Sequence, residues 1–402
     1  MKQGWEVKKL GDVCDVIGGG TPSKANSKFY NGEIPWATVR DMKYDFIIET
    51  EHKITKEAVK NSSTNIIPKG NVIIATRVGL GKVCLIKDDT AINQDLRGIV
   101  PKNPDELSVG YLFRWLKSIA HIIEKEGTGA TVQGVKLPFI KSLSIPLPPL
   151  PEQKRIVAIL DEAFSAIAKA KANAEQNLKN AKELFESYLQ DLFTKLFQTS
   201  DKKLISEIAK VIGGYSFKSG DFTKEGKYQV IRMGNVRPGI IRENESPVFI
   251  DAMEEKALTK ALLLPNDVII TQTGTKKKRD YGFTVIIEKK NYLLNQRIAS
   301  IRFSDKYLPK FFLYFSWTNI FKDQYFANET GTVGQGNVGI GAITDAEVPF
   351  IPVKEQKVII DRIDELRIET KKLEAIYQQK LNDLEELKKS VLQKAFNGEL
   401  KT

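Results

Sequence analysis

The segment Pro146-Leu-Pro-Pro-Leu-Pro-Glu-Gln-Lys154 opens the longest part of the chain without a helix breaker, because neither Gly nor Pro occurs from Glu152 to Ile212. Pro is tolerated in the first turn of a helix but not in its interior. A carboxylate near a helix N-terminus also interacts favourably with the helix dipole. Pro151 and Glu152 therefore predict the start of a long helix.

Apolar residues follow this start at alternating steps of four and three, which is the spacing of a coiled-coil seam rather than of a globular core. At about 1.5 Å per residue, the stretch from Glu152 to Phe197 makes a rod roughly 70 Å long. Such a rod is too long to lie inside one small domain. The seam residues predicted for this helix are Ile156, Leu160, Ile167, Leu178, Phe185 and Leu192.

A second copy of the same signal occurs near the end of the chain. Pro349-Phe-Ile-Pro-Val-Lys-Glu-Gln-Lys357 repeats the proline-rich hinge, and Gly398 follows the second breaker-free stretch as a C-cap. Thr370 and Lys380 interrupt the second seam. Its predicted apolar members are Ile359, Ile363, Leu366, Leu373, Leu384, Leu387 and Val391.

The repeat extends to the segments before each helix, which we call the first and second lobes. Lys9-Leu-Gly-Asp-Val-Cys-Asp-Val-Ile-Gly-Gly19 corresponds to Leu204-Ile-Ser-Glu-Ile-Ala-Lys-Val-Ile-Gly-Gly214. Short apolar runs between turn signals predict strands with a few helices in each lobe. We expect an α+β fold of mixed α/β lobes with an internal pseudo-two-fold duplication. The expected domains are a first lobe at 1–150, a helix at 151–200, a second lobe at 201–353 and a helix at 354–402.

Two further matches relate the lobes. Trp36-Ala-Thr-Val-Arg-Asp-Met42 corresponds to Val230-Ile-Arg-Met-Gly-Asn-Val236, and Asn93-Gln94 corresponds to Asn295-Gln296. Because both lobes keep the Asn-Gln pair, we interpret it as a shared structural hydrogen bond.

Charge is concentrated on the lobes. The first lobe has 21 Lys and Arg against 16 Asp and Glu, and the second has 22 against 17, whereas the two helical segments have net charges of zero and +1. This distribution is typical of lobes that bind a polyanion and helices that bind protein. A solubilising bias is the simpler alternative.

The two cysteines, Cys14 and Cys84, have no Cys or His neighbour at metal-ligand spacing. No apolar run is long enough to span a membrane, and the N-terminus lacks the apolar core of a signal peptide. These features predict a cytoplasmic protein without disulfides, metal or membrane contact.

On the two hinges, the two long helices and the lobe openings that end at Gly19 and Gly214, the chain resembles the DNA-specificity subunits of type I restriction-modification systems. The resemblance covers the whole chain in the order lobe, helix, lobe, helix. It implies that the lobes are target recognition domains and that the helices form an antiparallel coiled coil. It also implies two bound methyltransferase subunits, which carry the S-adenosylmethionine, and restriction (translocase) subunits in the full complex.

Catalytic motifs are missing from the sequence. The Pro148-Pro149 pair lies in the hinge and not in an amino-methyltransferase tetrapeptide, and Gly79-Leu-Gly-Lys82 lacks the spacing and the Ser or Thr of a phosphate loop. The histidines His52 and His121 have no evident catalytic partner nearby. We therefore expect no catalytic residue and no cofactor on this chain.

DNA contacts are expected from loop and strand-end residues, because Arg and Lys suit guanine or phosphate, Asn and Gln suit adenine, and Thr suits either. The run Lys276–Arg279 is the strongest signal, since adjacent cations repel one another unless phosphates or water neutralise them. Each of the other candidates, taken alone, fits a phosphate contact or a solvated surface group better than a base reader. In the first lobe the candidates are Thr21, Lys24, Arg40, Thr76, Arg77, Lys82, Thr131 and Gln133. In the second they are Lys218, Arg232, Asn235, Arg237, Gln272, Thr273, Lys276, Lys277, Lys278, Arg279, Tyr281 and Gln335.

We therefore expect a non-catalytic subunit that reads a bipartite, asymmetric target in double-stranded DNA and assembles with methyltransferase and restriction subunits. One alternative is a nucleic-acid-binding scaffold without sequence preference, whose binding would depend strongly on salt. Another is a stand-alone nuclease or methyltransferase, against which the missing cofactor motif argues.

Overall fold

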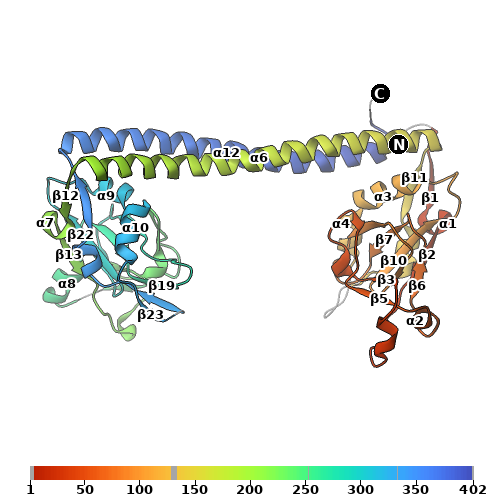
Figure 1. Cartoon of the computed structure of the whole chain (residues 1–402), viewed down its shortest axis with the longest axis horizontal. Coiled ribbons are helices and arrows are strands. Elements are labelled where there is room, and N and C mark those ends of the chain that lie inside the picture. The colour runs from red at the N-terminus through yellow and green to blue at the C-terminus, as the bar shows by residue number, and fades with distance from the viewer. Residues whose placement is uncertain (1–3, 128–133, 252, 333, 401–402) are drawn as a thin grey trace. The chain divides into compact units, whose positions relative to one another are not determined.

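The computed structural model describes residues 4–127, 134–251, 253–332 and 334–400. Its contacts divide the chain into two compact units (Figure 1). Unit 1 comprises residues 1–175 and 379–402, and unit 2 comprises residues 176–378. The boundaries cut both long helices, so each unit contains one lobe, the start of one helix and the end of the other.

The first lobe, in unit 1, is built on a five-stranded sheet with the strand order β2-β10-β7-β8-β4. All four residues of β7 are buried, as the apolar run Val-Ile-Ile-Ala predicts for an inner strand. A second sheet has the order β5-β3-β9-β6, and β1 pairs with β11. The strands are β1 (Glu6–Lys9), β2 (Cys14–Gly18), β3 (Ile34–Ala37), β4 (Phe46–Ile47), β5 (His52–Ile54), β6 (Asn65–Ile67), β7 (Val72–Ala75), β8 (Val83–Ile86), β9 (Thr90–Ile92), β10 (Leu96–Pro101) and β11 (Ser144–Leu147).

Helix α3 (Val109–Ser118) carries the aromatic residues that join this lobe to the long helices. Tyr111 and Trp115 are buried in one core with Ile156, Leu160 and Phe396. The ring centroids of Tyr111 and Phe396 are 5.2 Å apart. The other helices of the lobe are α1 (Leu10–Val13), α2 (Lys56–Lys60), α4 (Ala120–Glu126) and α5 (Leu137–Ser142).

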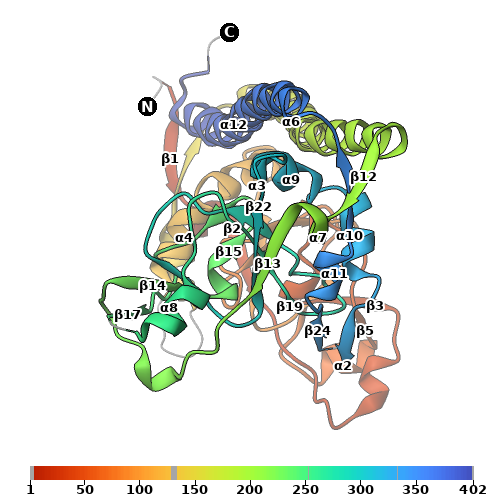
Figure 2. The same cartoon turned by 90° about the vertical axis from the view of Figure 1, so that its left-hand side faces the viewer.

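The second lobe, in unit 2, contains a four-stranded sheet β13-β22-β18-β20, three-stranded sheets β17-β14-β21 and β19-β24-β23, and the pairs β12-β25 and β15-β16 (Figure 2). The strands are β12 (Asp201–Leu204), β13 (Ala209–Gly213), β14 (Tyr228–Ile231), β15 (Val236–Arg237), β16 (Ile240–Ile241), β17 (Phe249–Ile250), β18 (Val268–Thr271), β19 (Thr273–Gly274), β20 (Thr284–Ile286), β21 (Tyr292–Leu294), β22 (Ile298–Phe303), β23 (Thr330–Thr332), β24 (Gln335–Asn337) and β25 (Glu347–Phe350). The helices are α7 (Ile205–Ile208), α8 (Glu255–Ala261), α9 (Pro309–Phe315), α10 (Asn319–Phe326) and α11 (Gly341–Thr344).

The strand order confirms the duplication. The order β13-β22-β18-β20 in the second lobe repeats the order β2-β10-β7-β8 in the first. Trp36 of β3 lies opposite Ala91 of β9 in a parallel pair, and Val230 of β14 lies opposite Leu293 of β21 in the same way. The mixed α+β fold class is likewise confirmed.

Each long helix is held to its lobe by a buried glutamine at its start. In α6 (Leu150–Thr199), Gln153 accepts a hydrogen bond from the Ser108 backbone N–H at 2.9 Å and donates to the Glu106 and Pro148 carbonyl oxygens at 2.8 and 2.9 Å. In α12 (Val353–Asn397), Gln356 accepts from the Leu308 N–H at 2.8 Å and donates to the carbonyl oxygens of Lys306 and Ile351 at 3.1 and 2.8 Å. The repeated Glu-Gln-Lys sequence therefore encodes a repeated clamp.

The two helices run antiparallel within unit 1. Lys171 Nζ of α6 lies 2.6 Å from Glu385 Oε1 of α12. Phe164 comes earlier in α6, and its ring centre lies 5.5 Å from Nζ of Lys388, which comes later in α12. In unit 2, Arg362 of α12 lies over the ring of Tyr188 of α6. The lobes' cores also include residues of these helix halves, so packing against a lobe supplements the helix–helix contacts.

Two of the predicted seam positions are exposed, and the others are buried or half-buried. Leu373 and Leu387 are 39% and 48% exposed, whereas Thr370, expected to interrupt the seam, is 2% exposed and donates to the Leu366 carbonyl. Ile359, Leu366, Leu373 and Leu387 share one heptad position, and a straight helix drifts by about 20° per heptad from such a repeat. Of the other predicted positions, Ile156, Leu160, Ile167 and Ile363 are buried and Leu178, Phe185, Leu192, Ile359, Leu366, Leu384 and Val391 are half-buried.

Candidate nucleic-acid interface

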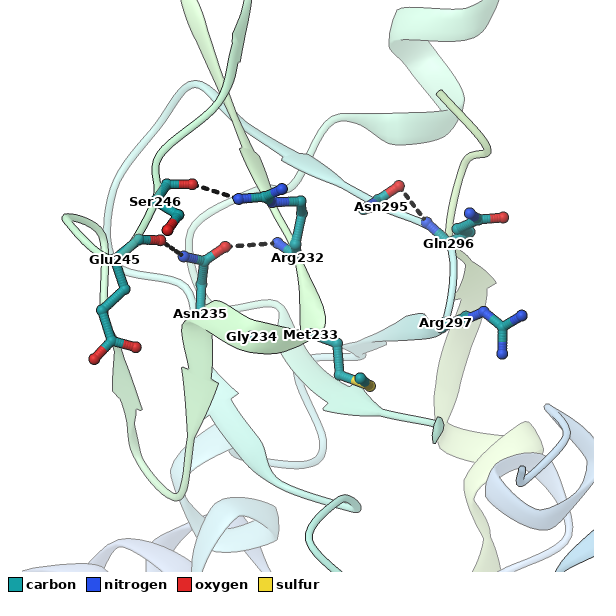
Figure 3. A pocket seen from close by; sticks show the side chains of 9 residues that line it. All are labelled: Arg232, Met233, Gly234, Asn235, Glu245, Ser246, Asn295, Gln296 and Arg297. Carbon is teal, nitrogen blue, oxygen red and sulfur yellow. Dashed lines mark hydrogen bonds between the residues drawn. The ribbon is translucent and has the colours of Figure 1, made fainter. Parts of the chain in front are cut away.

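A 3-10 turn at Met233–Asn235 follows β14 and forms one side of a hollow in the second lobe (Figure 3). Asn235 is buried, and its side chain accepts from the Arg232 backbone N–H at 3.1 Å. Its amide also donates to the carbonyl oxygens of Arg242 and Glu245 at 3.1 and 2.8 Å. The Arg232 guanidinium donates to the Ser246 carbonyl. These bonds hold the turn in place.

The turn Asn295-Gln296-Arg297, between β21 and β22, lies across the hollow from this cluster (Figure 3). Asn295 accepts a hydrogen bond from the Gln296 backbone N–H at 2.9 Å, and Arg297 has a φ of 68°. The side chains of Gln296 and Arg297 are exposed. The hollow has a volume of ≈ 550 Å³.

A second hollow of ≈ 610 Å³ shares Met233 and Gly234 with the first. Arg237, Thr273 and Gln335 line it. The two hollows therefore adjoin at this turn, and their lining includes side chains able to donate to base edges or phosphates.

The first lobe contains the equivalent turns. Asp41, in the 3-10 turn Val39–Asp41, is buried and accepts from the backbone N–H groups of Thr38 at 2.7 Å and Glu51 at 2.8 Å. Asn93 is buried and accepts from the Asp95 N–H at 3.1 Å, whereas Gln94 is exposed. Corresponding turns thus occur in both lobes, although Arg297 has a positive φ and its counterpart Asp95 does not.

Arginines stabilise these turns from within. Arg97 donates to the Gln94 carbonyl at 3.0 Å, and burial followed by the charge of Arg77 lowers the pKa of Arg97. In the second lobe, Arg237 donates to the carbonyl oxygens of Gly234 and Val236 at 3.1 and 2.8 Å. In each lobe, therefore, one arginine next to the turns, Arg97 or Arg237, binds backbone carbonyl oxygens and holds the turn in place.

The first-lobe candidates fall into three groups. Lys24, Arg40, Arg77 and Lys82 are exposed and Thr21 is half-buried, but Thr76 is 1% exposed and donates to the Asp95 carbonyl. Arg40 and Arg77 lie 3.7 Å from Glu51 and 3.8 Å from Asp95, so both are within reach of a carboxylate. Thr131 and Gln133 lie outside the described residues.

The second-lobe candidates divide in the same way. Exposed ones are Lys218, Lys277, Lys278, Arg279 and Gln335, and half-buried ones are Arg232, Arg237, Gln272 and Lys276. Asn235, Thr273 and Tyr281 are buried, and their polar atoms bond within the lobe. We therefore assign these three residues, and Thr76 in the first lobe, to the internal structure of the interface.

Arg279, at the end of the run Lys276–Arg279, packs against an aromatic ring of the lobe. The Arg279 guanidinium lies 4.9 Å from the centre of the Phe326 ring and lines a different hollow, beside Trp317. Burial of Tyr281 and its hydrogen bond to Glu329 raise the pKa of this tyrosine. Lys277 and Lys278 remain as exposed cations of the run.

The sequence interpretation missed four residues that line the hollows or the turns: Gln94, Gln296, Arg297 and Met233. It treated each Asn-Gln pair as one structural unit, but the structure separates a turn-forming Asn from an exposed Gln. One sequence feature could have identified the two glutamines. A hydroxyl residue follows Gly19 and Gly214 by two positions, and these residues, Thr21 and Ser216, donate to Gln94 and Gln296.

Within the described ranges, no group of three or more His, Cys, Asp and Glu side chains is placed to hold a metal ion. Over the same residues, no helix has the length and apolar character required to cross a membrane.

The family model described as "Type I restriction modification DNA specificity domain" matches residues 2–179 and 198–386. The MjaIX specificity subunit of Methanocaldococcus jannaschii is 27% identical over 292 residues, which are 68% of this chain and 67% of that protein. The EcoR124I/EcoR124II specificity subunit of Escherichia coli is 33% identical over 196 residues, which are 47% of this chain and 48% of that protein. The crystal structure of the HsdS subunit from Thermoanaerobacter tengcongensis is similar in fold, with a TM-score of 0.65, 18% identity and coverage of 100% of this chain and 98% of that one.

Proposed function

The chain belongs to the family of type I restriction-modification DNA specificity subunits, and from this premise we propose that it reads a bipartite, asymmetric DNA target for methyltransferase and restriction subunits. The family consists of specificity subunits and not of methyltransferases or nucleases, so the chemistry belongs to the partners. S-adenosylmethionine would bind to the methyltransferase. We place the protein in the cytoplasm, where it meets the cell's DNA.

One observation carries the proposal of an asymmetric target. Equivalent turns in the two lobes present different side chains, because Arg40 corresponds to Gly234 and Asp95 corresponds to Arg297. Arg suits the acceptor edge of guanine, and a carboxylate suits the amino group of cytosine. Two lobes that present different groups at corresponding positions would recognise two different half-sites.

The proposed pair of methyltransferase subunits is supported by two further hollows, one in each unit. In unit 1, Trp115 and Leu392 line a hollow of ≈ 900 Å³. In unit 2, Trp317 and Leu189 line one of ≈ 800 Å³. Leu189 and Leu392 occupy equivalent positions of the duplicated helices, so the same partner could dock twice.

The exposed Ile122 in the first of these hollows offers a test of the stoichiometry. Ile122→Arg should reduce the number of bound methyltransferase subunits from two to one in native mass spectrometry. Retention of two would exclude this docking site, and Ile66→Arg, at another exposed apolar position of the same lobe, is the control.

Methylome sequencing of a strain with and without the gene tests the function itself. One bipartite methylated motif should disappear with the gene. A scaffold without sequence preference would leave every motif intact, and its affinity would depend on salt equally for all DNA sequences.

A further inference from the structure

The strongest unassigned feature is a hydroxyl–glutamine pair that occurs once in each lobe. In the first lobe the Thr21 hydroxyl donates to Gln94 Oε1, and in the second the Ser216 hydroxyl donates to Gln296 Oε1 at 3.2 Å. The two pairs lie at corresponding positions of the duplicated sequence. They involve neither of the long helices.

A close backbone approach holds each pair together. A Cβ atom at Gly19 would lie 2.1 Å from the Asn93 carbonyl oxygen, and one at Gly214 would lie 1.9 Å from that of Asn295. No other residue type fits at such distances, because real Cβ atoms do not come this close to backbone atoms. The glycines therefore bring the segment with the hydroxyl against the segment with the glutamine.

Backbone hydrogen bonds add to this approach. The Gly20 N–H donates to the Ile92 carbonyl at 3.0 Å, and the Tyr215 N–H donates to the Leu294 carbonyl at 3.0 Å. These bonds fix the backbone next to each hydroxyl residue against the strand that leads to each glutamine. The pair is thus preorganised for a contact.

The hydrogen bond also sets which end of each glutamine is available. A glutamine that reads adenine uses its oxygen and its amide nitrogen together. Here the hydroxyl uses one of the two lone pairs of Oε1 and fixes the orientation of the amide group, whose N–H donors face away from the hydroxyl. A donor suits an acceptor-only partner such as a phosphate oxygen.

Comparison of the lobes indicates which part of DNA this partner is. The positions beside the glutamines differ between the lobes, with Asp95 against Arg297 and Arg40 against Gly234, whereas the pair itself is kept. A contact shared by two readers of different sequences must address something that both half-sites possess. The phosphate backbone is common to every half-site and positions a protein without specifying bases.

We propose that Thr21–Gln94 and Ser216–Gln296 form a duplicated phosphate contact that sets the register of each lobe on its half-site. This inference rests on the proposed function. The neighbouring positions, which differ between the lobes, would then select the bases.

The experiment uses the full chain in its complex with the methyltransferase subunits and duplexes that contain the motif found by methylome sequencing. Gln94→Leu and Gln296→Leu should each weaken binding by about tenfold, the scale of one hydrogen bond to a charged group. The preferred motif, selected from a randomised duplex library, should not change. The salt slope should also stay constant, because a neutral side chain releases no counterion.

A methylphosphonate scan then locates the contact. With the unaltered protein, replacing one particular phosphate in each half-site should weaken binding. Gln94→Leu should be insensitive to that replacement in its own half-site and remain sensitive in the other. Gln176→Leu, at an exposed position of α6, is the matched control, and equal thermal melting of all variants excludes misfolding.

Each other result overturns the inference in a distinguishable way. A changed base at one position of the motif would make the glutamine a base reader, and unchanged affinity with an unchanged scan would show no contact. If the unaltered complex does not prefer the motif duplex over a scrambled one, the proposed function fails as well.

Discussion

The two lobes share the order of four strands in their main sheets but differ in the groups they present beside the Asn-Gln turn. In the first lobe, Arg40 and Asp95 lie at positions that are Gly234 and Arg297 in the second. The buried parts of the two turns agree, because Asp41 and Asn235 both accept hydrogen bonds from the backbone of their own turn. The buried residues of the two turns thus make similar contacts, while the exposed positions differ.

The hinges differ at four of their nine positions, but both keep the buried glutamine. Gln153 and Gln356 are fully buried, and each makes one accepted and two donated hydrogen bonds to the backbone. A buried amide with every partner satisfied tolerates little change, because each lost bond leaves a buried polar group without a partner. The comparison shows that this chain keeps the buried glutamine contacts of its hinges, whereas exposed positions such as Arg40 and Gly234 differ between the lobes.

The largest effect is expected from charge in the helix cores. Leu160 in unit 1 and Ile363 in unit 2 are equivalent and fully buried. Replacing either with Asp should lower the free energy of unfolding by about 3–5 kcal/mol, because the buried carboxylate has no partner. Chemical denaturation measures this, with Ile368→Asp at an exposed position as the control. Equal stability of the buried and exposed variants would contradict the packing described here.

The second prediction concerns substitutions that give the first lobe the residues of the second. Arg40→Gly with Asp95→Arg gives the first lobe the chemistry of the second. The bases preferred in the half-site of the first lobe should change, with a difference in binding free energy of about 1–3 kcal/mol for each altered base. The other half-site should keep its bases. Methylation mapping checks both halves at once. An unchanged first half-site would show that these positions do not select bases.

Replacing the buried glutamine of either hinge should lower the stability of its unit by a similar amount. Gln153→Leu and Gln356→Leu should each lower stability by about 1–3 kcal/mol, because buried backbone groups lose their partners. Amide hydrogen exchange at Ser108 and Leu308 reports the loss in each unit separately. If one variant is neutral, the two clamps are not equivalent.

A smaller effect is expected from the exposed cations of the second lobe. Lys277→Ser with Lys278→Ser should reduce the slope of log affinity against log salt by about 0.9 per lost phosphate contact, without changing the motif. Binding titrations at several salt concentrations measure the slope. An altered motif at full affinity would instead make these residues base readers.

The smallest effect distinguishes the units by pH. Burial raises the pKa of Cys14 to about 12, and the equivalent position in the second lobe is Ala209, which does not titrate. The unfolded thiol ionises above about pH 8.5 while the folded thiol stays protonated, so stability falls as pH rises, by at most about 1.4 kcal/mol per pH unit. Unfolding curves at pH 8 and 9.5 should show this loss for the unaltered protein and a smaller one for Cys14→Ala. An identical loss in both would rule out Cys14 as its source.

The amino-acid sequence by itself determined the architecture. The absence of Gly and Pro after Glu152, the spacing of the apolar residues and the repeated Glu-Gln-Lys are local signals, and local signals predict helices and duplications reliably. The family resemblance was also carried by these contiguous segments, because hinge and lobe openings occur in one order along the chain.

Tertiary structure alone decided which side chains of those segments are exposed. Asn93 and Gln94 are neighbours in sequence, yet the first is buried in a turn and the second faces out, because Gly19 brings another strand end against the first. Leu373 and Leu387 follow the heptad spacing but are exposed, because the helix drifts away from that repeat. Exposure depends on contacts between residues far apart in sequence, and no local pattern contains them.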